Sequence, residues 1–153
     1  MSFLEKYIKL QQVVYDHKFE YEIHIDDQID QDDSLIPPMF IQPFIENAIL
    51  HGALSVEKGW VSITIKRESD DRMLIQIADN GVQKDSSEVN SKKMFRSMST
   101  SIIQQRIENL KNTFDYQISY SVESRREATD IQGTLIVLSI PMKYKNQEMV
   151  SAV

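Results

Sequence analysis

The spacing of apolar residues along this chain switches several times between a helical and an extended period, and this alternation restricts the fold more than any other feature. From Phe3 to Val14 the apolar residues recur every three or four positions, as on one face of an amphipathic helix. From Phe19 to Ile25 they occupy every second position, which is typical of a strand with one buried face. A domain that mixes both elements packs helices against a sheet.

A second helix is predicted from about Pro38 to His51, where apolar residues again recur at helical spacing. We expect Pro43 to kink this helix, because proline lacks an N–H. Gly52 follows directly, and we expect it to end the helix in a left-handed conformation.

The rest of the chain predicts further strands and one further helix around a polar stretch. The strands are Trp60–Glu68, Arg72–Asp79, Tyr116–Ser124 and Thr134–Pro141, and the helix is Met98–Phe114. The stretch from Asn80 to about Ser97 has no period, and we expect it to be a lid. The predicted fold class is α/β (α+β): a two-layer sandwich of a mixed, mostly antiparallel sheet of about five strands, with about three helices on one face.

Composition narrows the class of protein further. A chain of 153 residues that is 41% hydrophobic can form one domain with a core. It has no cysteine, which excludes disulfides and thiolate metal sites, and a cytoplasmic location is the default expectation. The net charge of −6, without a dense Lys/Arg stripe, argues against nucleic acid as a partner. No apolar run approaches the ~20 residues of a membrane-spanning helix.

Three polar residues on the second helix are candidates for chemistry. Asn47 and His51 are four residues apart and share one helix face, and Glu46 lies beside them, so we expect these side chains to converge. Taken alone, the Glu-Asn pair has a simpler explanation, in which it caps or hydrogen-bonds nearby backbone.

Two further landmarks lie in the strands. Asp79-Asn80-Gly81 ends a buried strand, and Gly133-Thr134 opens the last one. With these landmarks, the segment Gln42-Pro-Phe-Ile-Glu-Asn-Ala-Ile-Leu-His-Gly52 resembles the N box of LytS-like sensor histidine kinases. The resemblance extends over roughly Phe3 to Met142 and implies the Bergerat-type ATP-binding fold, which gyrase, Hsp90-type chaperones and MutL-type proteins share.

The resemblance implies that the strand residues bind the adenine of ATP. Asp79 would accept a hydrogen bond from the exocyclic amine, whereas the carbonyl of guanine would be repelled. Gly81 would let the nucleotide approach closely. Gly133 and Thr134 would complete the adenine site, with the hydroxyl of Thr134 bridging directly or through water. The alternative for Thr134 is an ordinary β-branched strand residue.

For the helix, the resemblance implies Mg²⁺ binding and catalysis. Asn47 would supply a neutral oxygen to the Mg²⁺ of ATP. Glu46 would act as general base toward an incoming imidazole or hold a water of the metal shell. His51 is placed with the nucleotide-binding residues. Its alternatives are a metal ligand, which would lack a second ligand at metal spacing, and a helix-end histidine favoured by the helix dipole.

Several basic residues complete the set that the resemblance implies. Lys92, Lys93 and Arg96 in the lid would neutralise the phosphates, and the alternative is a solvated run of charges. Arg106 matches an arginine of the family in the helix that follows.

The sequence departs from the family pattern at two glycine boxes. Gln83 stands where a second glycine is common after Asp-x-Gly, and Ser97-Met98-Ser99-Thr100-Ser101 replaces the glycine-rich box before the third helix. We expect these changes to leave adenine recognition intact and to affect phosphate binding, and with it nucleotide affinity and turnover.

A histidine kinase also needs a phosphoacceptor. None of His17, His24 and His51 lies in the acceptor context of the family. We therefore expect a fragment that does not autophosphorylate alone: residues 1–16 as the end of a linker helix from the missing acceptor region, 17–143 as the catalytic domain and 144–153 as a flexible tail. The expected partners are the kinase's own phosphoacceptor helices and a response regulator. We expect the full-length kinase to be a homodimer, anchored in the inner membrane.

Two alternatives to ATP·Mg²⁺-dependent phosphoryl transfer remain open at this point. One is a degenerate domain that binds nucleotide weakly or not at all and signals by protein contacts, which Gln83 and Ser99 favour. The other is an ATPase of the gyrase or chaperone type, against which the LytS-like N box and the small size both argue.

Overall fold

The computed structural model describes residues 2–30, 34–35, 40–82, 105, 107–109, 117–126 and 132–144 of the chain. The helical elements are α1 (Ser2–Val14), α2 (Gln42–Asn47), the π-helical turn η1 (Ala48–Gly52) and the 3-10 turn η2 (Ala53–Ser55). The strands are β1 (Phe19–Ile25), β2 (Ser34–Leu35), β3 (Gly59–Arg67), β4 (Arg72–Asp79), β5 (Ser119–Arg126), β6 (Gln132–Pro141) and β7 (Lys143–Tyr144).

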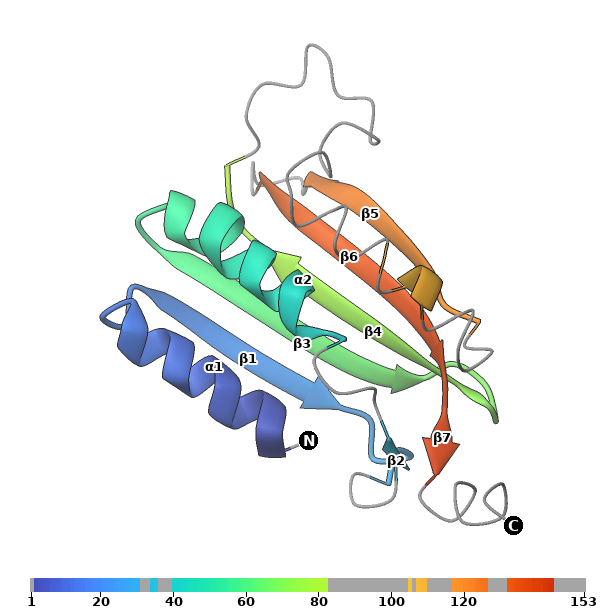
Figure 1. Cartoon of the computed structure of the whole chain (residues 1–153). Coiled ribbons are helices and arrows are strands. Elements are labelled where there is room, and N and C mark those ends of the chain that lie inside the picture. The colour runs from blue at the N-terminus through green and yellow to red at the C-terminus, as the bar shows by residue number, and fades with distance from the viewer. Residues whose placement is uncertain are drawn as a thin grey trace.

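The long strands form one mixed sheet in the order β1-β3-β4-β6-β5. β1 pairs with β3 in parallel, and the other neighbours are antiparallel. The parallel step follows from the chain path, because α2 and its two short turns cross over between β1 and β3. α1 and α2 cover the same face of the sheet (Figure 1). The predicted two-layer, mostly antiparallel α/β architecture is confirmed.

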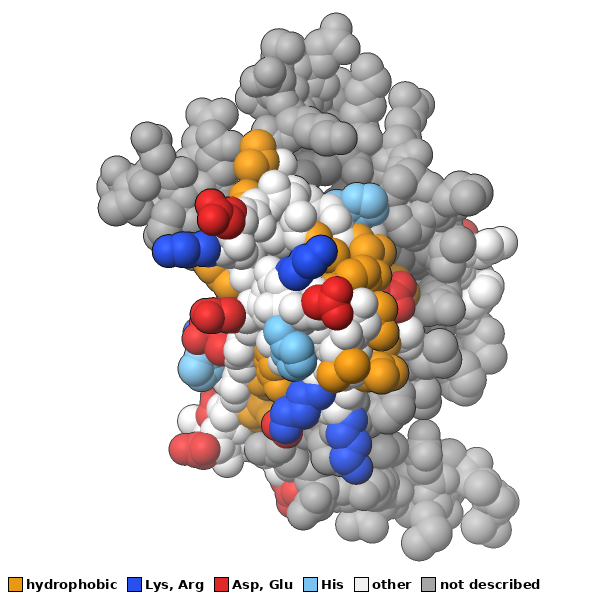
Figure 2. Space-filling model, turned by 90° about the vertical axis from the view of Figure 1, so that its left-hand side faces the viewer, with side chains coloured by type: hydrophobic (Ala, Val, Ile, Leu, Met, Phe, Trp, Pro, Cys, Tyr) orange, Lys and Arg blue, Asp and Glu red, His pale blue; other side chains and the backbone are white. Residues whose placement is uncertain are grey.

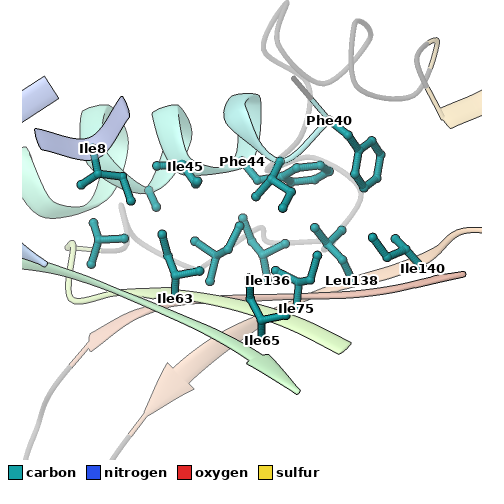
Figure 3. Close-up of a cluster of buried hydrophobic side chains, with 14 of the residues drawn as sticks. Ile8, Phe40, Phe44, Ile45, Ile63, Ile65, Ile75, Ile136, Leu138 and Ile140 are labelled. Carbon is teal, nitrogen blue, oxygen red and sulfur yellow. The ribbon is translucent and has the colours of Figure 1, made fainter. Parts of the chain in front are cut away.

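The core lies between the helices and this face of the sheet. Alternate residues of the central strands point into it, so that Ile63, Ile75 and Leu138 are fully buried. Phe44 and Ile45 of α2 pack down onto them, as Figure 3 shows. The alternation of buried and exposed residues along each strand therefore fixes which strand residues face the helices.

The predicted bounds agree with the structure to within one residue for α1, β1, β3 and β4. The predicted first helix begins one residue late, β1 and β4 have the predicted bounds, and β3 is shifted by one residue. β5 begins three residues later than predicted and β6 two residues earlier. Of the helix predicted over residues 98–114, the structure describes residues 105 and 107–109, which are helical. The predicted lid lies outside the described residues from residue 83 onward.

Two predictions for the second helix are wrong. The α-helix begins at Gln42, so Pro43 occupies its first turn, where a missing N–H breaks no helical hydrogen bond and causes no kink. Gly52 has φ −100° and ψ −93°, which is not left-handed. Instead of ending at a cap, the helix widens into the π turn η1 and continues into η2. Such π turns are frequent at functional sites.

The short ribbon β2–β7 was not predicted, because two residues are too few to show a period. Ser34 pairs with Tyr144 and Leu35 with Lys143. Tyr144, the first residue of the predicted flexible tail, thus belongs to a strand, and residues 145–153 lie outside the described part of the chain. Among the described residues, no helix has the length and apolar character that crossing a bilayer requires.

A comparison of two leucines tests this placement of the core. Leu138 in β6 is 0% exposed, whereas Leu10 in α1 is 59% exposed. We expect Leu138→Ala to lower the free energy of unfolding by about 2–5 kcal/mol, because it leaves a cavity. Leu10→Ala should change it by no more than about 0.5 kcal/mol. Urea unfolding of both variants measures the difference, and equal losses would contradict the described packing.

Candidate functional site

Asp79 is a buried carboxylate at the end of β4. Its side chain is 4% exposed. Because alternate residues share a face, Asp79 points to the same helix-covered side as Ile75 and Ile77. Its Oδ1 accepts a hydrogen bond from the N–H of Gly81 at 2.8 Å. A buried charge is costly unless it is hydrogen-bonded, so this N–H both stabilises and orients the carboxylate.

Three glycines surround Asp79 where any side chain would collide. A Cβ on Gly52 would lie 2.3 Å from Cγ of Asp79, and a Cβ on Gly133 would lie 1.9 Å from the Asp79 carbonyl oxygen. A Cβ on Gly81 would lie 2.4 Å from Cα of Gly52. Three segments therefore meet around Asp79: the end of η1, the segment after β4 and the start of β6. They can approach this closely because each has a glycine at the point of contact. The immediate reason for Gly81 is this backbone packing; close approach of a nucleotide stays a prediction.

Two polar side chains anchor the segment after β4. Asn80 accepts a hydrogen bond from the N–H of Trp60 at 2.8 Å and donates to the carbonyl oxygen of Lys58 at 2.7 Å. Ser55 Oγ accepts from the N–H of Val82 at 3.0 Å and donates to the carbonyl oxygen of Gly52 at 2.7 Å. The first residues of the predicted lid, Asn80 and Val82, are thus tied to the chain around η2 and the start of β3.

Thr134 lies next to Asp79 in the sheet. β4 and β6 are antiparallel with Ala78 opposite Leu135, and continuing this register by one residue places Thr134 opposite Asp79. Thr134 shares the helix-covered face with Ile136 and is half-buried. The structure therefore brings Asp79, Gly81, Gly133 and Thr134 together, and their role in binding adenine stays a prediction.

Convergence of Glu46, Asn47 and His51 stays a prediction. Phe44, Ile45 and Ala48 face the sheet, and one step of ~100° separates Glu46 from Asn47 on the side of α2 away from the sheet. Oε1 of Glu46 accepts hydrogen bonds from the hydroxyl of Tyr7 at 2.6 Å and from Nε2 of Gln42 at 2.9 Å.

The bond from Tyr7 turns Glu46 toward α1. His51 is exposed in η1, directly before Gly52.

The bond to Glu46 also affects Tyr7. Burial, followed by the hydrogen bond to the Glu46 carboxylate, raises the pKa of the Tyr7 hydroxyl well above its usual range. Tyr7 therefore keeps its proton at neutral pH and acts as a hydrogen-bond donor.

The remaining predicted site residues lie outside the described residues: Lys92, Lys93, Arg96, Arg106, Gln83 and the serine-rich segment 97–101. Their roles stay predictions. Within the described ranges, no three His, Cys, Asp or Glu side chains group as they would around a metal ion.

Sequence reasoning missed several residues that build this site. Gly52 was expected only as a helix cap, although its position one residue after the predicted histidine is a usable signal. Asn80 was noted as part of a motif without a role. The partnership of Tyr7 and Glu46 joins residues 39 positions apart, and no local pattern reveals it.

The fold is that of histidine kinase catalytic domains. The mycobacterial sensor histidine kinase MprB matches with a TM-score of 0.63 and 14% identity, over 92% of each chain. The histidine kinase domain of the Erythrobacter litoralis EL346 blue-light activated kinase matches with a TM-score of 0.60 and 14% identity, over 92% of this chain and 63% of that one. Full-length ShkA in complex with AMPPNP matches with a TM-score of 0.60 and 15% identity, over 94% of this chain and 30% of that one.

Among histidine kinases, the sequence resembles LytS. It is 35% identical over 82 residues to the sensor protein LytS of Oceanobacillus iheyensis, covering 53% of this chain and 14% of that protein. It is 33% identical over 82 residues to the putative uncharacterized protein YwpD of Bacillus subtilis, covering 53% of this chain and 28% of that protein. The chain thus spans less than a third of the length of these relatives. No family model matches it.

The contact between Gly52 and Asp79 can be tested by a double-mutant cycle. Gly52→Ala should lower the free energy of unfolding by roughly 1–3 kcal/mol, because the new methyl group overlaps the carboxyl group. In an Asp79→Ala background the two nearest contacting atoms are gone, so the same substitution should cost less. Additive losses in chemical denaturation would show that the two residues do not touch.

Proposed function

We propose that the chain binds ATP with Mg²⁺ and donates the γ-phosphate to a histidine in the phosphoacceptor region of a two-component sensor kinase. The observation that carries this proposal is the buried, hydrogen-bonded carboxylate of Asp79. It lies at the end of the central strand of a histidine-kinase fold and is surrounded by three glycines. The LytS match and the complex of ShkA with AMPPNP, an ATP analogue, support it.

The environment of Asp79 fits recognition of adenine. A carboxylate that is nearly excluded from water and oriented by a backbone N–H is a strong acceptor for the exocyclic amine of the base. Guanine carries a carbonyl oxygen at that position, which the carboxylate would repel. Thr134, opposite Asp79 in the sheet, would add its hydroxyl to the same hydrogen-bonding system.

The phosphate end would lie toward α2 and the segment after Gly81. Asn47, the residue after Glu46 in α2, would supply a side-chain oxygen to Mg²⁺, which neutralises charge on the phosphates when bound. His51 lies close by at the end of the same helical segment, and Lys92, Lys93, Arg96 and Arg106 would contribute positive charge.

Transfer of the phosphoryl group requires an acceptor imidazole. Its nitrogen would attack the γ-phosphorus, the bond from that phosphorus to the bridging oxygen would break, and ADP would leave. Glu46 would take the imidazole proton as general base. In the structure Oε1 of Glu46 already accepts two hydrogen bonds, so the proton would go to Oε2.

The same proposal covers the setting of the domain. We propose that the acceptor histidine is carried by helices that precede α1 in the full-length kinase. The active kinase would be a homodimer, and a response regulator would receive the phosphate. The catalytic domain would work in the cytoplasm, and the full-length kinase would be anchored in the inner membrane.

Base selection tests the role of Asp79. ATP and ADP should bind this chain with clear preference over GTP, and Asp79→Asn should weaken ATP binding by about 1.5–3 kcal/mol, the scale of a hydrogen bond to a charged group. Asp27→Asn removes an exposed carboxylate and is the matched control, which should bind as the original chain does. Calorimetric titration gives the affinities. Equal affinity for GTP would refute the adenine site, and absence of any nucleotide binding would favour the degenerate module.

Substitutions of Glu46 and Asn47 should affect different quantities, the phosphorylation rate for Glu46 and Mg²⁺-dependent nucleotide binding for Asn47. Asn47→Ala should weaken nucleotide binding in the presence of Mg²⁺ more than in its absence. Glu46→Gln keeps an oxygen that accepts from Tyr7 and Gln42, so ATP affinity should stay unchanged. In the kinase that carries the acceptor histidine, Glu46→Gln should lower the phosphorylation rate by ~10² to 10⁴, as loss of a general base does. An unchanged rate with a destabilised fold would make the carboxylate structural.

A further inference from the structure

Tyr7 contributes a hydrogen bond from a helix that the nucleotide site does not otherwise use. It lies in α1, whereas Glu46 lies in α2, 39 residues further along the chain. The distance from the Tyr7 hydroxyl to Oε1 of Glu46 is 2.6 Å, which is in the range of a strong O–H···O⁻ bond. Burial and the adjacent carboxylate raise the pKa of Tyr7, so the hydroxyl keeps its proton and donates.

Two donors hold the same oxygen of Glu46. The hydroxyl of Tyr7 and the Nε2 of Gln42 both bond to Oε1, and they approach from different helices. The terminal torsion of a glutamate is otherwise broad, so an isolated carboxylate would sample many orientations. Fixing one oxygen from two directions fixes the plane of the carboxyl group and determines where Oε2 points.

α1 is docked on the domain by core packing and by hydrogen bonds. Ile8 is fully buried and points toward Ile45 of α2 (Figure 3), and Gln12 donates to the carbonyl oxygen of Phe19 at 2.9 Å. On the outer side, Val13 and Val14 are exposed. Figure 2 shows this side of the molecule, over which apolar and charged side chains are interspersed.

The contacts around Asp79 come from other elements. Gly52, Gly81 and Gly133 belong to η1, the segment after β4 and β6, and none of them lies in α1. A change in the position of α1 would therefore alter the hold on Glu46 while leaving the described surroundings of Asp79 in place.

We propose that Tyr7 is a positioning residue for phosphoryl transfer: its hydroxyl orients the Glu46 carboxylate, so that the chemical step depends on the docking of α1 while nucleotide binding does not. This inference rests on the proposed general-base role of Glu46. Tyr7 itself transfers no proton; it acts only through Glu46.

The test is a set of isosteric variants in the kinase that carries the acceptor histidine. Tyr7→Phe removes only the hydroxyl and should lower the phosphorylation rate at saturating ATP on the order of tenfold, with unchanged ATP affinity. Gln42→Met removes the second donor to Oε1 and should also slow the reaction. Tyr21→Phe is the matched control, because it removes a hydroxyl from β1, away from the two donors to Glu46, and it should leave the rate unchanged.

The Glu46→Gln background separates this inference from the proposed function. If Tyr7 acts through Glu46, Tyr7→Phe should cause no further loss of rate once Glu46 is glutamine. A slow Glu46→Gln kinase together with a normal Tyr7→Phe kinase would overturn the positioning role and leave the general base intact. A normal Glu46→Gln kinase would overturn the proposed role of Glu46 itself. A Tyr7→Phe variant that loses ATP affinity or thermal stability in step with its rate would make the bond merely structural.

Discussion

The structure around the site depends on burying one carboxyl group. Asp79 lies at the end of a central strand and is almost removed from water, and burying such a polar group is costly unless hydrogen-bond donors are held close to it. The N–H of Gly81 supplies one, and Gly52 and Gly133 let the neighbouring segments close around the carboxyl group without a Cβ. The register between β4 and β6 brings Gly133 close to Asp79, and the π turn after α2 brings Gly52 close to it. A shift in either would separate these glycines from Asp79.

Much of this arrangement could be predicted from sequence. The strands that carry Asp79 and Thr134 contain apolar runs typical of a sheet interior, and both ends of β4 were predicted correctly. The N-box segment and Asp79-Asn80-Gly81 have a spacing specific enough to indicate the histidine-kinase fold, which the structural matches confirm. Such motifs are informative because one local arrangement requires a carboxylate at one position and glycines at others.

The rest depends on contacts that no local pattern contains. Helical spacing placed Glu46 beside Asn47, but it could not show that Tyr7 of another helix holds the Glu46 carboxylate. The left-handed cap predicted at Gly52 failed because the glycine is needed for contact with Asp79, and a tertiary requirement replaced the usual reason for a glycine at a helix end. Likewise Pro43 suits a first helical turn as well as a kink, and only the true start of α2 separates the two.

The most direct test of nucleotide binding at Asp79 is a magnetic-resonance titration of the labelled chain with ATP and Mg²⁺. The chain has four glycines, whose amide signals are few enough to follow individually. Binding at the proposed site should shift the signals of Gly52, Gly81 and Gly133 together, with one dissociation constant. Glycine signals that stay unchanged at millimolar ATP, or shifts confined to residues away from Asp79, would contradict the account.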